Sequence, residues 1–369
     1  MGKVETLRVN NSMMDLQSLG WTPFFEAYFA PFREKGYGVG RIVVQHKDRY
    51  VLYSQKGELW AEVTGKFRHD AHGPQDFPAV GDWVVIKERA GEEVVLIYAM
   101  LERKSKFSRK AAGAKTDEQV LAANVDVAFL VSGLDHDFNV RRIERSLALA
   151  WDSGVEPVVV LNKVDLCANL DERIQEVESI ARGTSVMSIS AVQKGGLENL
   201  KSLLPTGTTG VLLGSSGVGK STMANALLGT DKQEVKEVRI RDSQGRHTTV
   251  CRELLLVPSG GMIIDSPGIR ELQLWGTGEG LTETFEDVEA LAGQCRFNDC
   301  RHENEPDCAV KKALENGTLD ESRWKSYLKL QREMHYLFLK QDQKAARIEK
   351  EKWKKLMRIP KLKNKNKFG

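Results

Sequence analysis

The pattern of apolar and polar positions changes several times along the 369-residue chain. In residues 1–35, aromatic side chains recur at nearly helical spacing from Trp21 to Phe32, which predicts a short amphipathic helix packed on the body. From about residue 36 to 101 the pattern becomes short β-like runs separated by Gly, Asp and Lys turns. These runs are residues 39–44, 50–53, 59–63, 83–86 and 94–99.

Five short strands in so short a stretch predict a small antiparallel barrel. An OB-type barrel has this strand count and commonly binds oligonucleotides. An SH3-like barrel or a protein-docking module gives a similar pattern, and we favour the OB type. The polar, basic stretch 103–118 is interpreted as a linker.

Apolar runs then alternate with helical patterns. The runs are residues 127–131, 158–161, 210–213 and 262–264, and the first two flank a helical pattern at 141–152. Alternation of this kind indicates an α/β domain with a mostly parallel sheet. After about residue 271 the strand patterns end, and helices are expected at 282–292 and from 319 to about 357.

Composition excludes a membrane-spanning protein. Hydrophobic residues make up 41% and charged residues 28% of the chain, as in soluble globular proteins. No apolar run approaches the roughly 20 residues that span a bilayer, and the N-terminus has no signal-peptide pattern. We therefore expect a cytoplasmic protein with no membrane contact.

Charge is concentrated at the C-terminal end. The net charge of the chain is +3, yet residues 340–369 carry twelve Lys or Arg against three acidic residues. Such a basic tail is typical of a solvated arm or of a nucleic-acid contact.

A phosphate-binding loop follows the run at 210–213. Its pattern is G-x-x-x-x-G-K-[ST], and with the next residue it comprises Gly214, Ser215, Ser216, Gly217, Val218, Gly219, Lys220, Ser221 and Thr222. The glycines allow backbone N–H groups to surround phosphate, Lys220 supplies positive charge and Ser221 a hydroxyl ligand for Mg²⁺. A second motif, Asp265-Ser266-Pro267-Gly268, follows the run at 262–264. Asp265 can hold Mg²⁺ there, and Gly268 lets the backbone approach the γ-phosphate.

A guanine-binding motif, Asn162-Lys163-Val164-Asp165, follows the run at 158–161. The Asp165 carboxylate can accept hydrogen bonds from N1–H and the 2-amino group of guanine, a donor pair that adenine lacks. This feature argues against a P-loop ATPase or kinase. The stem of Lys163 can cover one face of the base. Ser190 and Ala191 are expected to present backbone N–H groups to guanine O6.

The order of these motifs is permuted, because the base motifs precede the phosphate loop. The same pocket can form if the chain ends are joined differently. With this order, the chain resembles the ribosome small-subunit-dependent GTPase A family, the YjeQ/YloQ-type circularly permuted GTPases. The resemblance covers about residues 36–340. It implies a role in late maturation of the small (30S) ribosomal subunit, which members bind and which stimulates their GTP hydrolysis.

A metal site is expected in the C-terminal region. Cys295, Cys300, His302 and Cys308 offer three thiolates and one imidazole, a set that suits structural tetrahedral Zn²⁺. All four positions also resemble the zinc motif of this family. Scattered buried cysteines are the alternative, and an iron–sulfur cluster is disfavoured by the histidine. The five cysteines lack a secretory context, so no disulfide framework is expected.

The catalytic group is less obvious. Thr248 or Thr249 can complete Mg²⁺ coordination when GTP is bound, and we favour Thr249. Ile269 stands where other GTPases place a water-orienting glutamine, and Ile cannot hydrogen-bond to water. His247 is the nearest substitute in the sequence and resembles the histidine of the family's G-x-H-T-T motif. A role for His247 in RNA or solvent contact alone is the alternative.

The expected protein is thus a multidomain GTP hydrolase that requires Mg²⁺ and one structural Zn²⁺. Its partners would be GTP or GDP and the small ribosomal subunit with its 16S rRNA, and it would be a monomer. The alternative is an RNA-binding assembly factor that uses GTP only as an occupancy signal. The expected parts are an N-terminal helical extension (1–35), an OB-fold barrel (36–102), a linker (103–118), a circularly permuted α/β P-loop GTPase domain (119–272) and an α-helical zinc-binding domain with a basic tail (273–369).

Overall fold

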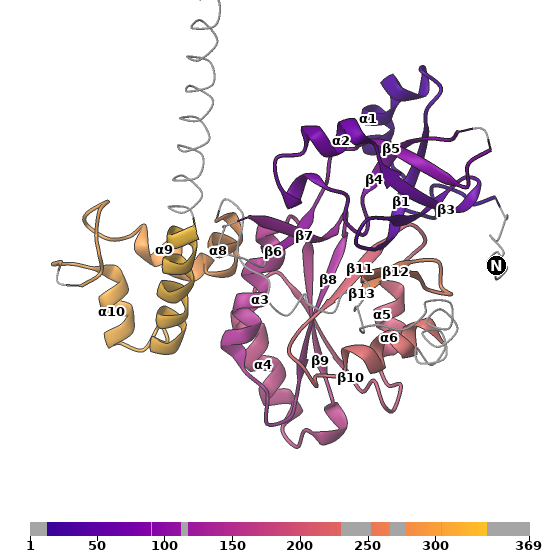
Figure 1. The fold of residues 1–369 in the computed structure, drawn as a ribbon. Coiled ribbons are helices and arrows are strands. Elements are labelled where there is room, and N and C mark those ends of the chain that lie inside the picture. The colour runs from indigo at the N-terminus through magenta and orange to yellow at the C-terminus, as the bar shows by residue number, and fades with distance from the viewer. Residues whose placement is uncertain are drawn as a thin grey trace, which may run out of the picture.

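The computed structural model shows a barrel, a central α/β unit and a C-terminal helical region that follow one another along the chain (Figure 1). The structure describes residues 13–89, 91–111, 117–229, 252–265, 278–303 and 305–337. Five predicted features lie outside the described residues: His247, Thr248, Thr249, Gly268 and the tail 340–369. Within the described residues, no helix has both the length and the apolar character needed to cross a membrane.

The predicted N-terminal amphipathic helix is α1 (Pro23–Arg33). Its inward side chains, Phe25 and Phe29, are buried. Trp21, just before the helix, meets Trp83 of the barrel edge-on with ring centroids 4.7 Å apart. These aromatic contacts hold the N-terminal extension against the barrel.

Five strands close into a barrel. They are β1 (Gly38–Gln45), β2 (Tyr50–Ser54), β3 (Gly57–Val63), β4 (Trp83–Lys87) and β5 (Val94–Met100). They pair in the circuit β1–β2–β3–β5–β4–β1, in which only β3 and β5 are parallel. Between β3 and β4 lie α2 (Gly65–Asp70) and the short 3₁₀ helix η1 (Pro74–Asp76). The closed five-stranded barrel confirms the OB-type prediction.

The expected linker at 103–118 was wrong for part of its length. Lys106–Lys110 form strand β6, which pairs with β7 (Glu118–Ala123) in an antiparallel hairpin. The charged residues suggested a linker, but Phe107 among them is fully buried. The apolar face of β7, which includes the buried Leu121, offers β6 a partner that its own composition does not reveal.

The central unit is a mostly parallel sheet in the order β10-β9-β8-β11-β13-β12. Its strands are β8 (Val127–Gly133), β9 (Glu156–Asn162), β10 (Ser185–Ile189), β11 (Thr209–Leu213), β12 (Arg252–Leu256) and β13 (Met262–Asp265). Only β12 runs antiparallel, and it pairs with β1 of the barrel. Barrel and central unit therefore share one eleven-stranded hydrogen-bonded sheet.

Helices cover both faces of the central sheet (Figure 1). They are α3 (Val140–Asp152), α4 (Leu170–Ile180), α5 (Leu197–Ser202) and α6 (Lys220–Leu228), with the 3₁₀ helix η2 (Val164–Leu166) after β9. Side chains of β8 alternate between the two cores, because successive residues of a strand point to opposite faces. Ala128 and Leu130 face the side of α3, while Phe129 and Val131 face that of α6.

The C-terminal region is helical, as predicted. It contains α8 (Glu279–Thr284), α9 (Glu286–Ala292), α10 (Ala309–Glu315) and a helix over 321–337. α8 packs directly on α3 (Figure 1). A Cβ at Gly280 would lie 2.1 Å from the carbonyl oxygen of Ala148, so only glycine permits this approach.

Candidate functional site

The phosphate-binding loop connects the central strand β11 to α6. Three of its glycines, Gly214, Gly217 and Gly219, have positive φ. Gly214 and Gly219 also have no room for a side chain: a Cβ would lie 2.2 Å from Val131 O and 2.3 Å from Asn162 Nδ2, respectively. The glycines thus let the loop pass closely over the ends of neighbouring strands. Loops of this kind can surround a phosphate with their backbone N–H groups.

Lys220 and Ser221 open α6, where helix N–H groups and the macrodipole attract anions. The Lys220 Nζ donates to the carbonyl oxygens of Gly214, at 2.7 Å, and of Ser215. The ammonium group therefore lies over the loop, within reach of a phosphate held by it. Thr222, the next residue, is part of the same first helical turn.

Asp265 ends β13, which runs parallel to β11. Carboxyl ends of parallel strands meet at one edge of a sheet, so Asp265 and the phosphate loop share this edge. The pairing of Val211 with Ile264 fixes their relative height. Asp265 and Ser221 are hard oxygen donors of the kind that Mg²⁺ prefers, so these residues fit the ion expected from the sequence.

The base-recognition motifs lie at the same edge, two strands away. Lys163, the N-cap of η2, lies in the left-handed region, with φ of 69°. Ser190 donates from Oγ to the Asp165 carboxylate at 2.5 Å, which holds that carboxylate in one orientation. Val164, between Lys163 and Asp165, packs against the main core.

Asn162 has a role that the motif pattern alone does not show. Its Nδ2 donates to Val218 O at 2.8 Å, and its Oδ1 accepts from the backbone N–H of Ala191 at 3.0 Å. The side chain is almost completely buried. Asn162 therefore ties the phosphate loop to the Ser190–Ala191 loop. The N–H groups of Ser190 and Ala191, expected to face guanine O6, donate here to Gly195 O and Asn162 Oδ1.

Sequence reasoning missed two carboxylates at this edge. Asp135 and Asp137 follow β8, the strand between β11 and β9, and contact Lys163 and Ser215 respectively. A signal was available, since polar residues directly after a buried parallel strand fall at the ligand-binding edge. Of the sequence-predicted nucleotide residues, the structure places at this edge Asn162 to Asp165, Ser190, Ala191, Gly214 to Thr222, and Asp265. His247, Thr249 and Gly268 lie outside the described residues.

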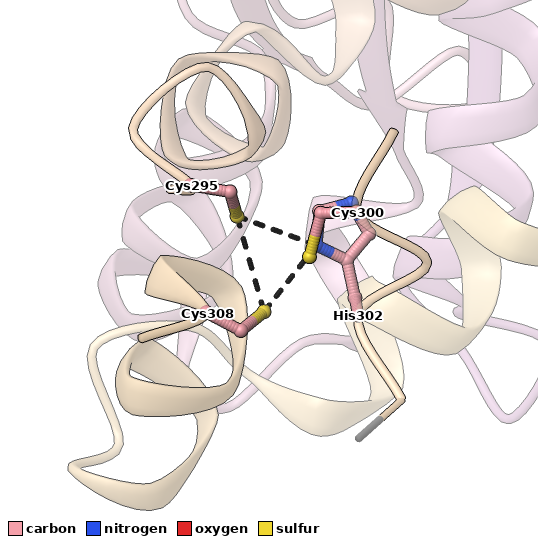
Figure 2. A group of neighbouring side chains, drawn as sticks. All are labelled: Cys295, Cys300, His302 and Cys308. Atoms are coloured by element: carbon pink, nitrogen blue, oxygen red, sulfur yellow. Dashed lines mark hydrogen bonds between the residues drawn. The ribbon is translucent and has the colours of Figure 1, made fainter. Parts of the chain in front are cut away.

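The four predicted metal ligands converge in the C-terminal region (Figure 2). Their ligand atoms lie within 4.8 Å of one another. Cys295 follows α9 and Cys308 caps α10, while His302 adopts the left-handed φ of 62° that turns its ring inward between them. These donors could hold a metal ion.

Neighbouring groups support this cluster. The Sγ of Cys308 accepts the backbone N–H of Lys311 at 3.5 Å, so this side chain caps the N-terminus of α10. Trp324, on the helix 321–337, meets the His302 ring edge-on at 5.5 Å between centroids. The cluster thus joins α9, α10 and the last described helix.

Taken together, the sheet order, the glycine loop and the base motifs define a P-loop GTPase whose base-binding strands precede its phosphate-binding strand, that is, a circularly permuted GTPase. The model of the RsgA GTPase family matches residues 100–275. The chain belongs to the RsgA family and is a GTPase.

Curated relatives and solved structures of the same kind are also similar to this chain. The chain is 48% identical to the small ribosomal subunit biogenesis GTPase RsgA of Opitutus terrae, over 93% of this chain and 96% of that protein. It is 47% identical to RsgA 1 of Oceanobacillus iheyensis, over 86% and 91%. The structure of YjeQ from Thermotoga maritima is similar, with a TM-score of 0.59, 30% identity, and 80% and 97% of the chains covered. YloQ, described as a circularly permuted GTPase, shares the fold at a TM-score of 0.57 and 24% identity, over 83% and 96%.

Proposed function

We propose that this GTPase acts in late maturation of the small (30S) ribosomal subunit, binds its 16S rRNA, and is stimulated by that subunit. The observation that carries this proposal is the near full-length similarity to relatives named small ribosomal subunit biogenesis GTPases. It extends beyond the nucleotide site to the barrel and to the C-terminal region with the Cys/His cluster. A protein of this kind would act as a monomer in the cytoplasm.

Guanine recognition would rest on Asp165, with the stem of Lys163 beside the base. The orientation of Asp165 by Ser190 supports this assignment, because a carboxylate held in place loses less entropy on binding. Gly214 to Thr222 would surround the phosphates. Asn162, Ser190 and Ala191 would shape the pocket through the bonds that link their loops.

Mg²⁺ would be held by Ser221, Asp265 and, in the GTP state, Thr249. The ion would neutralise charge on the β- and γ-phosphates. Lys220 would hold the same phosphates through its ammonium group, and Gly268 would bring backbone to the γ-phosphate. His247 is proposed to orient the attacking water, since Ile269 has no group that can do so.

The Cys295, Cys300, His302 and Cys308 cluster is proposed to hold one structural Zn²⁺. A tetrahedral zinc site with Zn–S distances of about 2.3 Å places neighbouring ligand atoms roughly 3.5 to 3.8 Å apart. Cys295 Sγ lies 3.9 Å from Cys308 Sγ and 3.5 Å from His302 Nδ1, which fits this geometry. Four protein donors leave no position for a substrate water, so the ion would stabilise the fold.

GTP turnover with and without purified small subunits tests the proposal. We expect small subunits to raise the turnover number, while an equal amount of large subunits leaves it near the basal value. His247→Ala should bind GTP normally but hydrolyse it slowly on the subunit. Turnover that responds equally to both subunits would overturn the proposed role. Tight GTP binding to the subunit complex without turnover would instead identify nucleotide as an occupancy signal.

A further inference from the structure

The segment 133–139 joins β8 to α3 and lies between the two halves of the nucleotide site. Its backbone is anchored to the base side, because Leu134 N–H donates to Asn162 O at 2.8 Å. At its other end Asn139 caps α3 by accepting the N–H of Arg142. The segment is thus held at one end by a backbone hydrogen bond and at the other by the side chain of Asn139.

One carboxylate of this segment pairs with the base-recognition motif. Lys163 Nζ donates to Asp135 Oδ2 at 2.6 Å. The two side chains are only 24% and 15% exposed, so this is a partly buried pair rather than a loose surface contact. The Lys163 side chain is thus fixed at two points: its backbone, which is in the left-handed region, and its Nζ, which is bound to Asp135. The aliphatic stem must run between these two points.

The second carboxylate pairs with the phosphate loop. Ser215 Oγ donates to Asp137 Oδ2 at 2.6 Å, and Arg142 donates to the same oxygen at 2.6 Å. Asp137 also donates its backbone N–H to Asp135 Oδ1 at 3.1 Å, so the two carboxylates are linked within one tight turn. A single turn therefore contacts both the base side and the phosphate side of the site.

We propose that this segment, 133–139, is a brace in which Asp135 positions Lys163 and Asp137 positions Ser215 for guanine nucleotide binding. The proposal rests on the nucleotide roles proposed above for Lys163 and the phosphate loop. Asp135 and Asp137 are positioning residues: they act through Lys163 and Ser215. Loss of either carboxylate frees a side chain that must then be ordered by the nucleotide, which weakens GTP and GDP alike.

Double-mutant cycles on the full-length protein test this brace, with the dissociation constant and off-rate of fluorescent GDP as the measurements. Asp135→Ala and Asp137→Ala should each weaken GDP binding about 3- to 10-fold, mainly through a faster off-rate. Asp135→Ala should add little on top of Lys163→Ala, and Asp137→Ala little on top of Ser215→Ala. Glu178→Ala removes an exposed carboxylate on α4 and should leave GDP binding unchanged.

The outcomes separate the brace from the proposed function. Additive effects within both pairs, or wild-type affinity in Asp135→Ala and Asp137→Ala, would overturn the brace. Failure of the wild-type protein to bind GDP would overturn the proposed nucleotide site itself. Asp135→Glu and Asp137→Asn provide milder variants should an alanine variant fail to fold. If the segment acts as a brace, both variants should bind GDP more weakly while their melting temperatures equal that of the wild-type protein.

Discussion

At the scale of single residues, the choice of base is proposed to depend on one oriented carboxylate. Asp165 lies in η2 directly after β9, and Ser190 holds it from the next loop along the sheet edge. Guanine presents two adjacent donors to such a carboxylate, and adenine presents none in that arrangement. A site built around a hydrogen-bond pair rejects a base that leaves the pair unmade far more strongly than an apolar pocket can.

Replacing Asp165 tests this directly. Asp165→Asn should weaken GDP binding by at least about 100-fold, because the bond to guanine N1–H loses its charged acceptor and the new amide places a donor against the 2-amino group. The same variant should bind xanthosine diphosphate more tightly than GDP, since xanthine has a carbonyl oxygen where guanine has an amino group. Isothermal titration with both nucleotides measures the switch.

Ser190→Ala is the matched control for this prediction. It keeps the Asp165 carboxylate and removes only the hydroxyl that orients it, so it should weaken GDP modestly without favouring xanthine. Unchanged GDP affinity in Asp165→Asn would contradict the assignment.

At the scale of elements, α3 makes the main contact between the central unit and the C-terminal region. Glu144 of α3 is fully buried, and Arg323 of the helix 321–337 donates to it at 2.8 Å. Arg323 also pairs with Asp287 of α9, at 2.6 Å. Burial raises the pKa of Glu144 above its ordinary value, although Arg141 and Arg323 favour its charged form. This ion network joins three helices from distant parts of the chain.

Removing Arg323 should therefore destabilise the C-terminal region. Arg323→Ala leaves Glu144 and Asp287 without their common partner, which should lower the free energy of unfolding of the C-terminal region by about 3–5 kcal/mol. Urea unfolding followed by tryptophan fluorescence reports the change, because Trp324 lies beside Arg323 in this region.

The control is Lys325→Ala on the same helix. Lys325 pairs with Glu321 at the surface, where the side chains are 69% and 74% exposed, so its loss should cost less than about 1 kcal/mol. Equal effects of the two substitutions on the free energy of unfolding would show that burial of the ion network adds no stability.

The loop between α9 and α10 is the second element whose stability can be tested. The four candidate metal donors, Cys295, Cys300, His302 and Cys308, join this loop to both helices. Structural zinc sites can contribute on the order of 10 kcal/mol to small domains. Removing metal with a strong chelator should therefore unfold the C-terminal region while the central unit keeps its GDP affinity.

Metal analysis should find one zinc ion per chain in the untreated protein. Cys300→Ser, prepared in the same way, should contain less zinc. Cys167→Ser should not, because Cys167 lies far from the cluster in the sequence. A C-terminal region that is indifferent to both the chelator and Cys300→Ser would contradict a structural metal.

At the scale of the whole molecule, barrel and GTPase unit form one body. β1 pairs with β12, and the buried Arg41 donates to Gly81 O of the barrel, Leu19 O of the N-terminal extension and Asn124 O beyond β7. Burial lowers the pKa of Arg41 to about 10, so the side chain stays charged at neutral pH. The barrel is therefore presented at a fixed position relative to the nucleotide site.

The basic tail can be tested at this scale, since none of the nucleotide motifs lies within residues 340–369 of the sequence. Deleting residues 340–369 should weaken small-subunit binding at moderate salt and leave GDP affinity of the free protein unchanged. Each lost phosphate contact should flatten the salt dependence by roughly 0.7–0.9 in log–log slope. Binding at several salt concentrations, measured by sedimentation or interferometry, gives both quantities.

A full-length variant separates charge from length. Replacing Lys361, Lys363, Lys365 and Lys367 with Gln keeps the tail and removes four positive charges. It should reproduce part of the deletion's effect on slope. A truncated protein with the affinity and slope of the full chain would show that the tail does not contact the subunit.

Sequence alone determined the parts of this protein that depend on neighbouring residues. A phosphate loop is a local pattern of glycines before a helix, and the metal ligands lie close together in the chain, so both could be recognised without knowing the fold. The strand and helix types also followed from periodicity, because alternation and helical spacing report which face of an element is buried. The barrel, the parallel sheet and the helical C-terminal region were predicted on this basis.

Tertiary structure alone decided which elements meet. Periodicity does not say which strands pair, so the β1–β12 junction and the β6–β7 hairpin were not foreseen. The contacts of Asn162, Asp135 and Asp137 depend on loops brought to one sheet edge from separate strands. The pair of Glu144 with Arg323 spans 179 positions in the chain. Such contacts form because buried polar groups must find partners wherever the fold places them, and that placement is a property of the packed chain.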